Sequence, residues 1–121
     1  MSTMESEDES FYEIKARTIA ILSNPKRLQI VDLLADRERS VSELAVALSL
    51  PQATTSQHLA VMRKAGVVDA RKDGNHVYYR LADPRIAAAC RVMSEAILGF
   101  LLSQQERLRP VLLVAQKQRH G

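Results

Sequence analysis

The stretch around Pro51 constrains the fold of this chain more than any other. A break marked by Pro51 is followed by a polar run over residues 52–58, and the helical pattern that continues from it stops at Gly66. Proline suits a turn or the first helical position, and glycine adopts the left-handed conformation that ends many helices. The pattern predicts a helix over residues 52–65 with a polar first half, entered through a tight turn.

A β-hairpin is predicted directly after this helix. Residues 67–71 and 76–81 alternate and are rich in residues that favour strands, and an Asp73-Gly74 pair lies between them. Asp-Gly between two alternating segments is a strong short-range hairpin signal. A helix entered through a turn and followed by a hairpin is the arrangement of a helix-turn-helix with a β-wing, a device that places side chains in the major groove of DNA.

Three further helices are predicted upstream. Ser10 and Glu13 have the spacing of a capping box, which predicts a first helix from residue 10. Asn24 is a good N-cap and Pro25 suits the first position of a second helix. Val41 is expected in a short strand or as a staple residue, and Ser42 as the cap of a third helix over residues 43–48. The side chains expected to face the core are Leu28, Val31, Leu34, Ala35, Leu44, Leu48, Leu59 and Met62.

The first and last helices carry more apolar surface than a small core can cover. The last helix is predicted to begin after Asp83 as N-cap and to kink or end at Pro110. Apolar stripes of this size usually mark an interface, and a symmetric dimer covers them at least cost. The predicted dimer-interface residues are Phe11, Ile14, Ile21, Ile86, Cys90, Met93, Ile97, Phe100 and Leu101.

The predicted fold class is mainly α with a small β-wing, in the order α-α-α-α-β-β-α. A length of 121 residues suits one domain. We expect a flexible acidic N-terminus over residues 1–9, a dimerising winged domain over residues 10–109 and a tail over residues 110–121. No run approaches the ~18 apolar residues of a membrane helix, and no secretory signal is expected. A single cysteine suits a reducing cytosol, so the predicted location is the cytoplasm.

Charge is divided unevenly along the chain. The overall net charge is +3, but residues 1–23 hold an excess of acidic side chains and the remainder an excess of basic ones. A basic body suits partners with phosphate backbones, because Lys and Arg contacts release condensed counterions. Solvated surface charge gives the same pattern, so charge alone decides little.

The sequence resembles the ArsR/SmtB family of winged-helix repressors. The resemblance lies in residues 24–30 (NPKRLQI), 42–45 (SELA), 52–59 with 62–68 (MRKAGVV), and the wing-like 74–81 (GNHVYYRL). It covers about residues 10–105. The resemblance implies a homodimeric DNA-binding repressor whose operator affinity is lowered by a chemical signal.

The predicted DNA face combines the start of the fourth helix with basic and polar side chains near the wing. A recognition helix contacts base edges with its N-terminal residues, and Gln, Thr and Ser can hydrogen-bond to bases or phosphates. Thr55 is expected to face inward, and a polar helix turn facing solvent is the alternative interpretation. The predicted DNA-binding residues are Gln52, Ala53, Thr54, Ser56, Gln57, His58, Arg63, Lys64, Arg71, Lys72, Asn75 and His76.

The metal-ligand sets known from this family are missing. The third-helix set resembles Glu-Leu-Cys-Val-Cys, whereas residues 43–47 here are Glu-Leu-Ala-Val-Ala; the last-helix set begins Asp-x-His, whereas Arg85 stands at the His position. No first-row metal would be held by such groups. The histidines, which show no ligand spacing, are His58, His76 and His120. No metal and no cofactor are predicted, and the inducer stays unknown.

Cys90 is the remaining group with distinctive chemistry. Some members of the family sense sulfane sulfur or oxidants through two thiols, but the second helix here has none. Core packing as a small hydrophobe and sensing through Cys90 alone both stay open. A winged-helix module for protein partners is a further alternative, although residues 52–57 lack the aromatic anchors of protein interfaces. No nucleophile–base pair or phosphate loop supports an enzyme.

Overall fold

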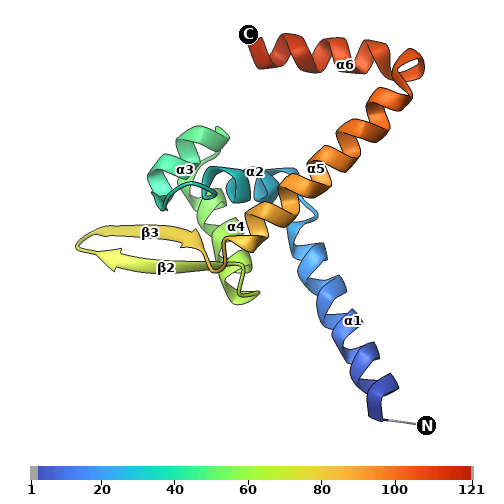
Figure 1. Cartoon of the computed structure of the whole chain (residues 1–121). Helices are drawn as coiled ribbons and strands as arrows, with labels where there is room; N and C mark the ends of the chain where they lie inside the picture. The colour runs from blue at the N-terminus through green and yellow to red at the C-terminus, as the bar shows by residue number, and fades with distance from the viewer. Residues whose placement is uncertain (1–2, 121) are drawn as a thin grey trace. The chain divides into compact units, whose positions relative to one another are not determined.

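The computed structural model describes residues 3–120, and the chain forms two compact units, residues 1–87 and 88–121. The first unit holds four helices and a small sheet (Figure 1). Most of α5, together with α6, forms the second unit. The elements in chain order are α1 (Thr3–Leu22), α2 (Pro25–Leu33), β1 (Arg39–Ser40), α3 (Val41–Leu48), α4 (Gln52–Lys64), β2 (Val68–Asp73), β3 (His76–Leu81), α5 (Arg85–Ser103) and α6 (Gln105–His120).

Helix α1 begins earlier than its capping signal suggested. It starts at Thr3, so Ser10 lies inside the helix and the predicted cap there is wrong. The α1–α2 junction follows the prediction: the Asn24 side chain accepts hydrogen bonds from the backbone N–H groups of Lys26 and Arg27 at 2.9 and 3.2 Å, and Pro25 opens α2.

Helix α3 is capped by Ser40 and not by Ser42. The Ser40 hydroxyl accepts the backbone N–H of Glu43 at 3.1 Å, and the Glu43 carboxylate accepts the backbone N–H of Ser40 at 3.3 Å. A capping box needs its Glu three residues after the cap, which Ser40 satisfies and Ser42 does not. Val41 is therefore the first residue of α3, and the short strand β1 precedes it.

The core of the first unit lies where α2, α3, α4 and the start of β2 meet. Val31, Leu34 and the predicted inward residues of α3 and α4 are buried, as expected. Leu28 is 45% exposed and Ala35 is also exposed, so their predicted core positions are wrong. Helix α2 is apolar on more than one side, so its sequence alone does not decide which side is buried. The side that carries Ile30 is the one that packs against α3 and α4. The buried core residues are Ile30, Val31, Leu34, Leu44, Ala45, Leu48, Thr55, Leu59, Met62, Val67 and Val68.

The sheet has three antiparallel strands in the order β1-β3-β2, and its β2–β3 hairpin extends away from the helices (Figure 1). Gly66 has φ +80° directly after the helix end, as predicted for a stop. The hairpin turn lies one residue later than expected. Asp73 still belongs to β2 and pairs with His76, so Gly74 and Asn75 form the turn, with φ +62° at Gly74. Glycine adopts this conformation without steric cost.

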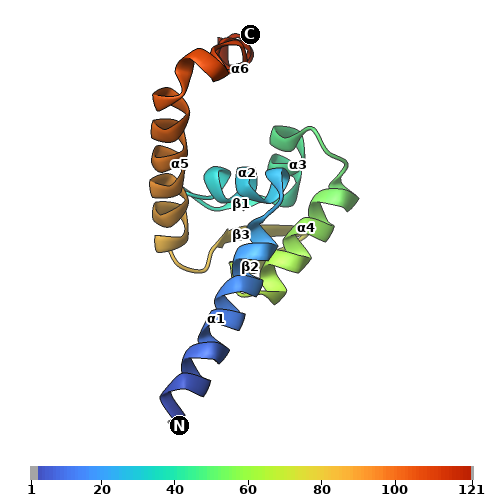
Figure 2. The same cartoon turned by 90° about the vertical axis from the view of Figure 1, so that its right-hand side faces the viewer.

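The second unit changes direction at Gln104, between α5 and α6 (Figure 2). The Ser103 hydroxyl donates to the Phe100 carbonyl at 2.7 Å and the Gln104 N–H bonds to the Leu101 carbonyl, which tightens the last turn and ends α5. Pro110, where a kink or end was predicted, lies inside α6. An 18-residue window of α5 has a mean hydropathy of 1.6 and would suit a membrane helix by length and composition alone, contrary to expectation.

Candidate nucleic-acid interface

Helix α4 has a polar face that is open to solvent and an opposite face that is fully packed. Thr55, Leu59 and Met62 are 0% exposed on the packed side. The Thr55 hydroxyl donates to the Pro51 carbonyl at 3.0 Å, so its polarity is satisfied inside the helix. Thr54 is half-buried, and the exposed predicted DNA-binding residues of this helix turn are Gln52, Ala53, Ser56 and Gln57. The predicted inward position of Thr55 is confirmed.

Two contacts fix the turn that presents this face. Ser49 adopts the left-handed conformation with φ 55°, and the Leu50 N–H bonds to the Ala45 carbonyl at 3.0 Å, which closes the end of α3. The Gln52 side-chain amide donates to the Ser42 hydroxyl at 2.6 Å. The first side chain of the α4 face is thus held by the first turn of α3, and the two helices of the helix-turn-helix are tied at their exposed edge.

His58 differs from the other predicted residues of α4. Its ring is half-buried and its Nδ1 accepts a hydrogen bond from Nε of Arg27 in α2, at 3.1 Å. Burial, and secondarily the positive charge of Arg27, lowers the pKa of His58 below its ordinary value. His58 was predicted among the DNA-binding residues, and the structure places its ring against the neighbouring helix α2.

Arg63 and Lys64 lie in the last turn of α4, at the opposite end from Gln52. At 1.5 Å per residue, Arg63 lies roughly 16 Å from Gln52 along the helix axis. Lys64 borders a groove of about 780 Å³ between α1 and α4, with Ile14, Arg17 and Ile21 among its lining residues. The structure therefore does not bring these two basic residues together with the polar start of the helix.

Arg71 on the wing is held by neighbours within its own chain. Its guanidinium forms a two-pronged ion pair with the carboxylate of Glu38, lies 3.7 Å from a carboxylate oxygen of Asp73, and stacks over the Tyr78 ring at 4.8 Å from the centroid. The hydrogen bond from Arg71 lowers the pKa of Glu38. Arg71 was predicted as a phosphate or minor-groove contact, and in this structure it braces β2 to the segment before β1.

The strand register explains which wing residues remain available. One face of the hairpin carries Asp69, Arg71 and Asp73 of β2 together with their cross-strand partners on β3, among them Arg80. Arg80 lies 3.8 Å from Asp69, so opposite charges are paired on this face. Lys72 alternates to the other face, and none of the ion pairs among the side chains that the structure describes involves it. The predicted wing residues that are exposed and outside these ion pairs are Lys72, Asn75 and His76.

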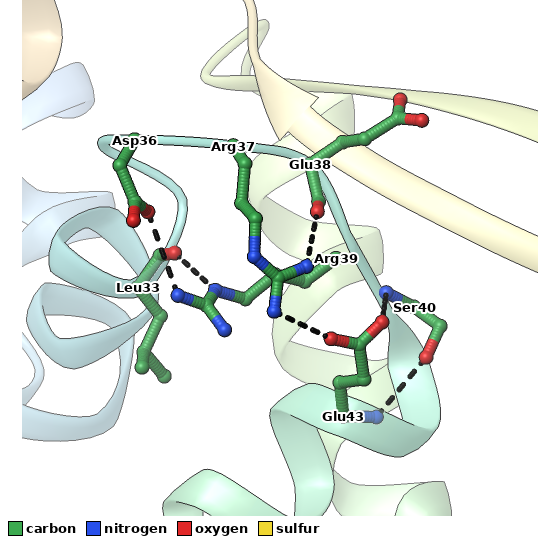
Figure 3. Close-up of polar contacts among 7 residues, drawn as sticks. All are labelled: Leu33, Asp36, Arg37, Glu38, Arg39, Ser40 and Glu43. Carbon is green, nitrogen blue, oxygen red and sulfur yellow. Dashed lines mark hydrogen bonds and ion pairs between the residues drawn. The ribbon is translucent and has the colours of Figure 1, made fainter.

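The segment that carries Glu38 is itself fixed by ion pairs (Figure 3). Arg37 binds the Glu43 carboxylate at 3.0 Å, and Arg39 reaches the Asp36 carboxylate at 3.5 Å and the carbonyl at the end of α2. In Figure 3 the Glu38 side chain points away from this cluster. The prediction missed Glu38 altogether, because its partner lies 33 residues along the chain.

The comparisons with known proteins agree on one family. The model of the arsR family of bacterial regulatory proteins matches residues 24–70. An uncharacterised helix-turn-helix transcriptional regulator of Mycobacterium tuberculosis, Rv0081, is 41% identical over 100 residues, which cover 82% of this chain and 87% of that protein. The chain belongs to the ArsR family. It is a helix-turn-helix transcriptional regulator.

Two further likenesses support this assignment. The crystal structure of Rv0081 matches this ArsR-family chain with a TM-score of 0.67, covering 78% of this chain and 95% of that one. The homodimeric winged helix-turn-helix DNA-binding domain of Mb0332 from Mycobacterium bovis is 28% identical, with a TM-score of 0.68 over 90% of this chain. The biofilm growth-associated repressor of Agrobacterium fabrum is 37% identical over 100 residues, which cover 79% of this chain and 82% of that protein.

Sensor groups of this ArsR-family chain are sparse in the part that the structure describes. Among the side chains that the structure describes, no three of the types His, Cys, Asp and Glu lie together as a metal site. Cys90 is half-buried in α5. The predicted interface residues Phe11, Ile14, Met93, Ile97 and Phe100 are each at least 51% exposed in the single chain, while Ile21, Ile86, Cys90 and Leu101 are half-buried.

Proposed function

We propose that this protein is a sequence-specific DNA-binding repressor that acts as a homodimer on a palindromic operator in the cytoplasm. The observation that carries the proposal is that α4 has one polar, exposed face and one buried face. Its exposed side offers Gln52, Ser56 and Gln57, and its other side is locked by three fully buried residues. Such a helix can enter a major groove without unpacking, and its amides match the donor and acceptor pattern of adenine.

The proposed DNA surface is narrower than the one predicted from the sequence. Gln52, Ala53, Thr54, Ser56 and Gln57 form its base-contacting part. Lys72, Asn75 and His76 on the wing form its phosphate or minor-groove part, because they are exposed and outside the ion pairs of the hairpin. Arg63 and Lys64 contribute at most long-range attraction, and Arg71 contributes through its brace.

Homodimerisation is proposed through α1 and α5. Helix α5 has no buried residue in the single chain, although apolar side chains run along its whole length. Apolar surface of this extent usually marks an interface. The similar DNA-binding domain of Mb0332 is homodimeric, and a twofold axis matches the symmetry of a palindromic DNA site. The residues proposed for this interface are Phe11, Ile14, Ile21, Ile86, Cys90, Met93, Ile97, Phe100 and Leu101.

The proposed signal is not a metal at either of the family's familiar sites, because Ala45 and Ala47 replace the third-helix thiols and Arg85 replaces a histidine. A metabolite or a thiol reaction is the remaining chemistry for release. Catalysis is not part of the proposal, since the chain's fold and family are those of regulators.

The function is tested by selecting DNA duplexes from a random library with the full-length protein and measuring their binding by fluorescence anisotropy. We expect enriched inverted repeats with half-sites one or more helical turns apart, bound ~10³-fold or more above random DNA. Gln57→Ala should lower this ratio, whereas Gln29→Ala, an exposed glutamine on α2, should not. A library without enrichment, or equal binding of all duplexes, would refute the proposal.

A further inference from the structure

One arginine joins three helices of the first unit. Arg27, in the first turn of α2, donates from Nη1 to the Ile21 carbonyl at 3.1 Å and from Nε to His58 Nδ1 at 3.1 Å. Ile21 lies in the last turn of α1 and His58 in α4, and α1, α2 and α4 are mutually in contact. A single guanidinium therefore links the end of α1 to the middle of the helix that carries the proposed DNA surface.

The hydrogen bond from Arg27 to the Ile21 carbonyl is favourable for both the guanidinium and the end of α1. Carbonyls in the last turn of a helix have no partner within the helix, and a positive side chain there interacts favourably with the negative end of the helix dipole. Arg27 is only partly exposed, so its bond to Ile21 is shielded from competing water. The planar guanidinium offers several donors in a fixed geometry, which lysine does not.

The bond to α4 requires one particular state of His58. Nδ1 accepts the hydrogen bond, so the ring is neutral and carries its proton on Nε2. The lowered pKa of His58 agrees with this state. His58 lies between the exposed Gln57 and the buried Leu59, so fixing its ring fixes the rotation of α4 that separates the groove-facing side chains from the packed ones.

Lys26, the residue before Arg27, makes a similar contact to α3, the first helix of the helix-turn-helix. Lys26 donates from Nζ to the Leu48 carbonyl at 2.9 Å, at the end of α3. The Asn24 cap holds the backbone of both Lys26 and Arg27. The first turn of α2 is thus hydrogen-bonded to both α3 and α4.

We infer that Arg27 is a positioning residue for DNA recognition, which ties the orientation of α4 to the end of α1 through His58 and the Ile21 carbonyl without touching DNA itself. This inference rests on the proposed function. Because α1 also carries exposed apolar residues proposed for the dimer, this link joins the proposed dimer interface to the proposed DNA surface.

The test compares full-length variants on the selected duplex and on random DNA at several salt concentrations. Arg27→Met and His58→Ala should each weaken binding to the selected duplex roughly tenfold, as for loss of a hydrogen bond to a charged group. The slope of log affinity against log salt should stay unchanged. His58→Asn, which keeps an acceptor near the position of Nδ1, should retain most of the affinity, and the double variant Arg27→Met/His58→Ala should be no worse than Arg27→Met.

Controls separate the possible outcomes. Arg17→Met removes an exposed arginine of α1 and should leave selectivity intact. A salt slope lowered by about one in Arg27→Met would identify a direct phosphate contact and overturn the inference, as would additive losses in the double variant. If Arg27→Met does not fold, His58→Ala and His58→Asn decide alone, since equal losses in both overturn it. A wild type without selectivity refutes the proposed function and this inference together, whereas the other contrary results leave the function standing.

Discussion

Replacing Ser40 by alanine tests the way in which the helix-turn-helix begins. Ser40 is 8% exposed, and its hydroxyl accepts the Glu43 N–H at 3.1 Å. The variant leaves that N–H without its cap, and losses of an N-cap cost about 1 kcal/mol, within a range of about 0.5–2. For a domain of this size the same change lowers the melting temperature by about 3–8 °C.

The matched control is Ser42→Ala, two residues further on. Ser42 is exposed and gives up only its bond to Gln52, so its variant should stay within about 0.5 kcal/mol of the wild type. Both variants are measured by urea unfolding, followed by far-ultraviolet circular dichroism at one fixed protein concentration, since a dimer's stability depends on concentration. If Ser42→Ala is as destabilising as Ser40→Ala, the assignment of the cap is wrong.

Three further outcomes are expected. Thr55→Val should change the unfolding free energy by less than about 1 kcal/mol, because the Pro51 carbonyl still accepts the Thr55 N–H at 3.0 Å; urea titration should show Thr55→Ser, which deletes a buried methyl, to be the more damaging change. Glu38→Gln should speed amide hydrogen exchange in the hairpin and weaken operator binding, because it removes the brace on Arg71; unchanged exchange contradicts the brace. Arg85 lowers the pKa of Asp83 from its ordinary value of 3.8 to about 2. Ionised Asp83 therefore stabilises the fold fully above pH 3.8, and this stabilisation is lost as the pH falls through about 2. The free energy of unfolding of Asp83→Asn should change less with pH over this range than that of the wild type.

Local signals in the sequence located most of the fold. Asn24 and Pro25 define the start of α2, Gly66 stops α4, and the alternation around Gly74 defines the hairpin, because each of these depends on conformational preferences of a few adjacent residues. The error at Ser42 was also local. The rule that places a glutamate three residues after the cap identifies Ser40 when it is applied to Glu43.

The candidate site was predicted less completely, because its side chains are arranged by contacts between distant segments. Arg71 has the composition and position of a phosphate contact, but Glu38, 33 residues away, holds it in place. His58 lies in a polar helical run, and only the packing of α2 on α4 turns it toward Arg27, 31 residues away. No periodicity within either segment contains this information.

Helix α5 has a consequence for how such a regulator can be present in a cell. The apolar residues of α5 are not buried within their own chain. If the proposed dimer buries them, folding and dimerisation are coupled. Stability then rises with the amount of protein made. Dilute chains leave Met93, Ile97 and Phe100 exposed to water, chaperones and proteases. The cellular abundance of the regulator therefore has a lower limit below which its own degradation, and not its affinity for DNA, determines how much of it can act.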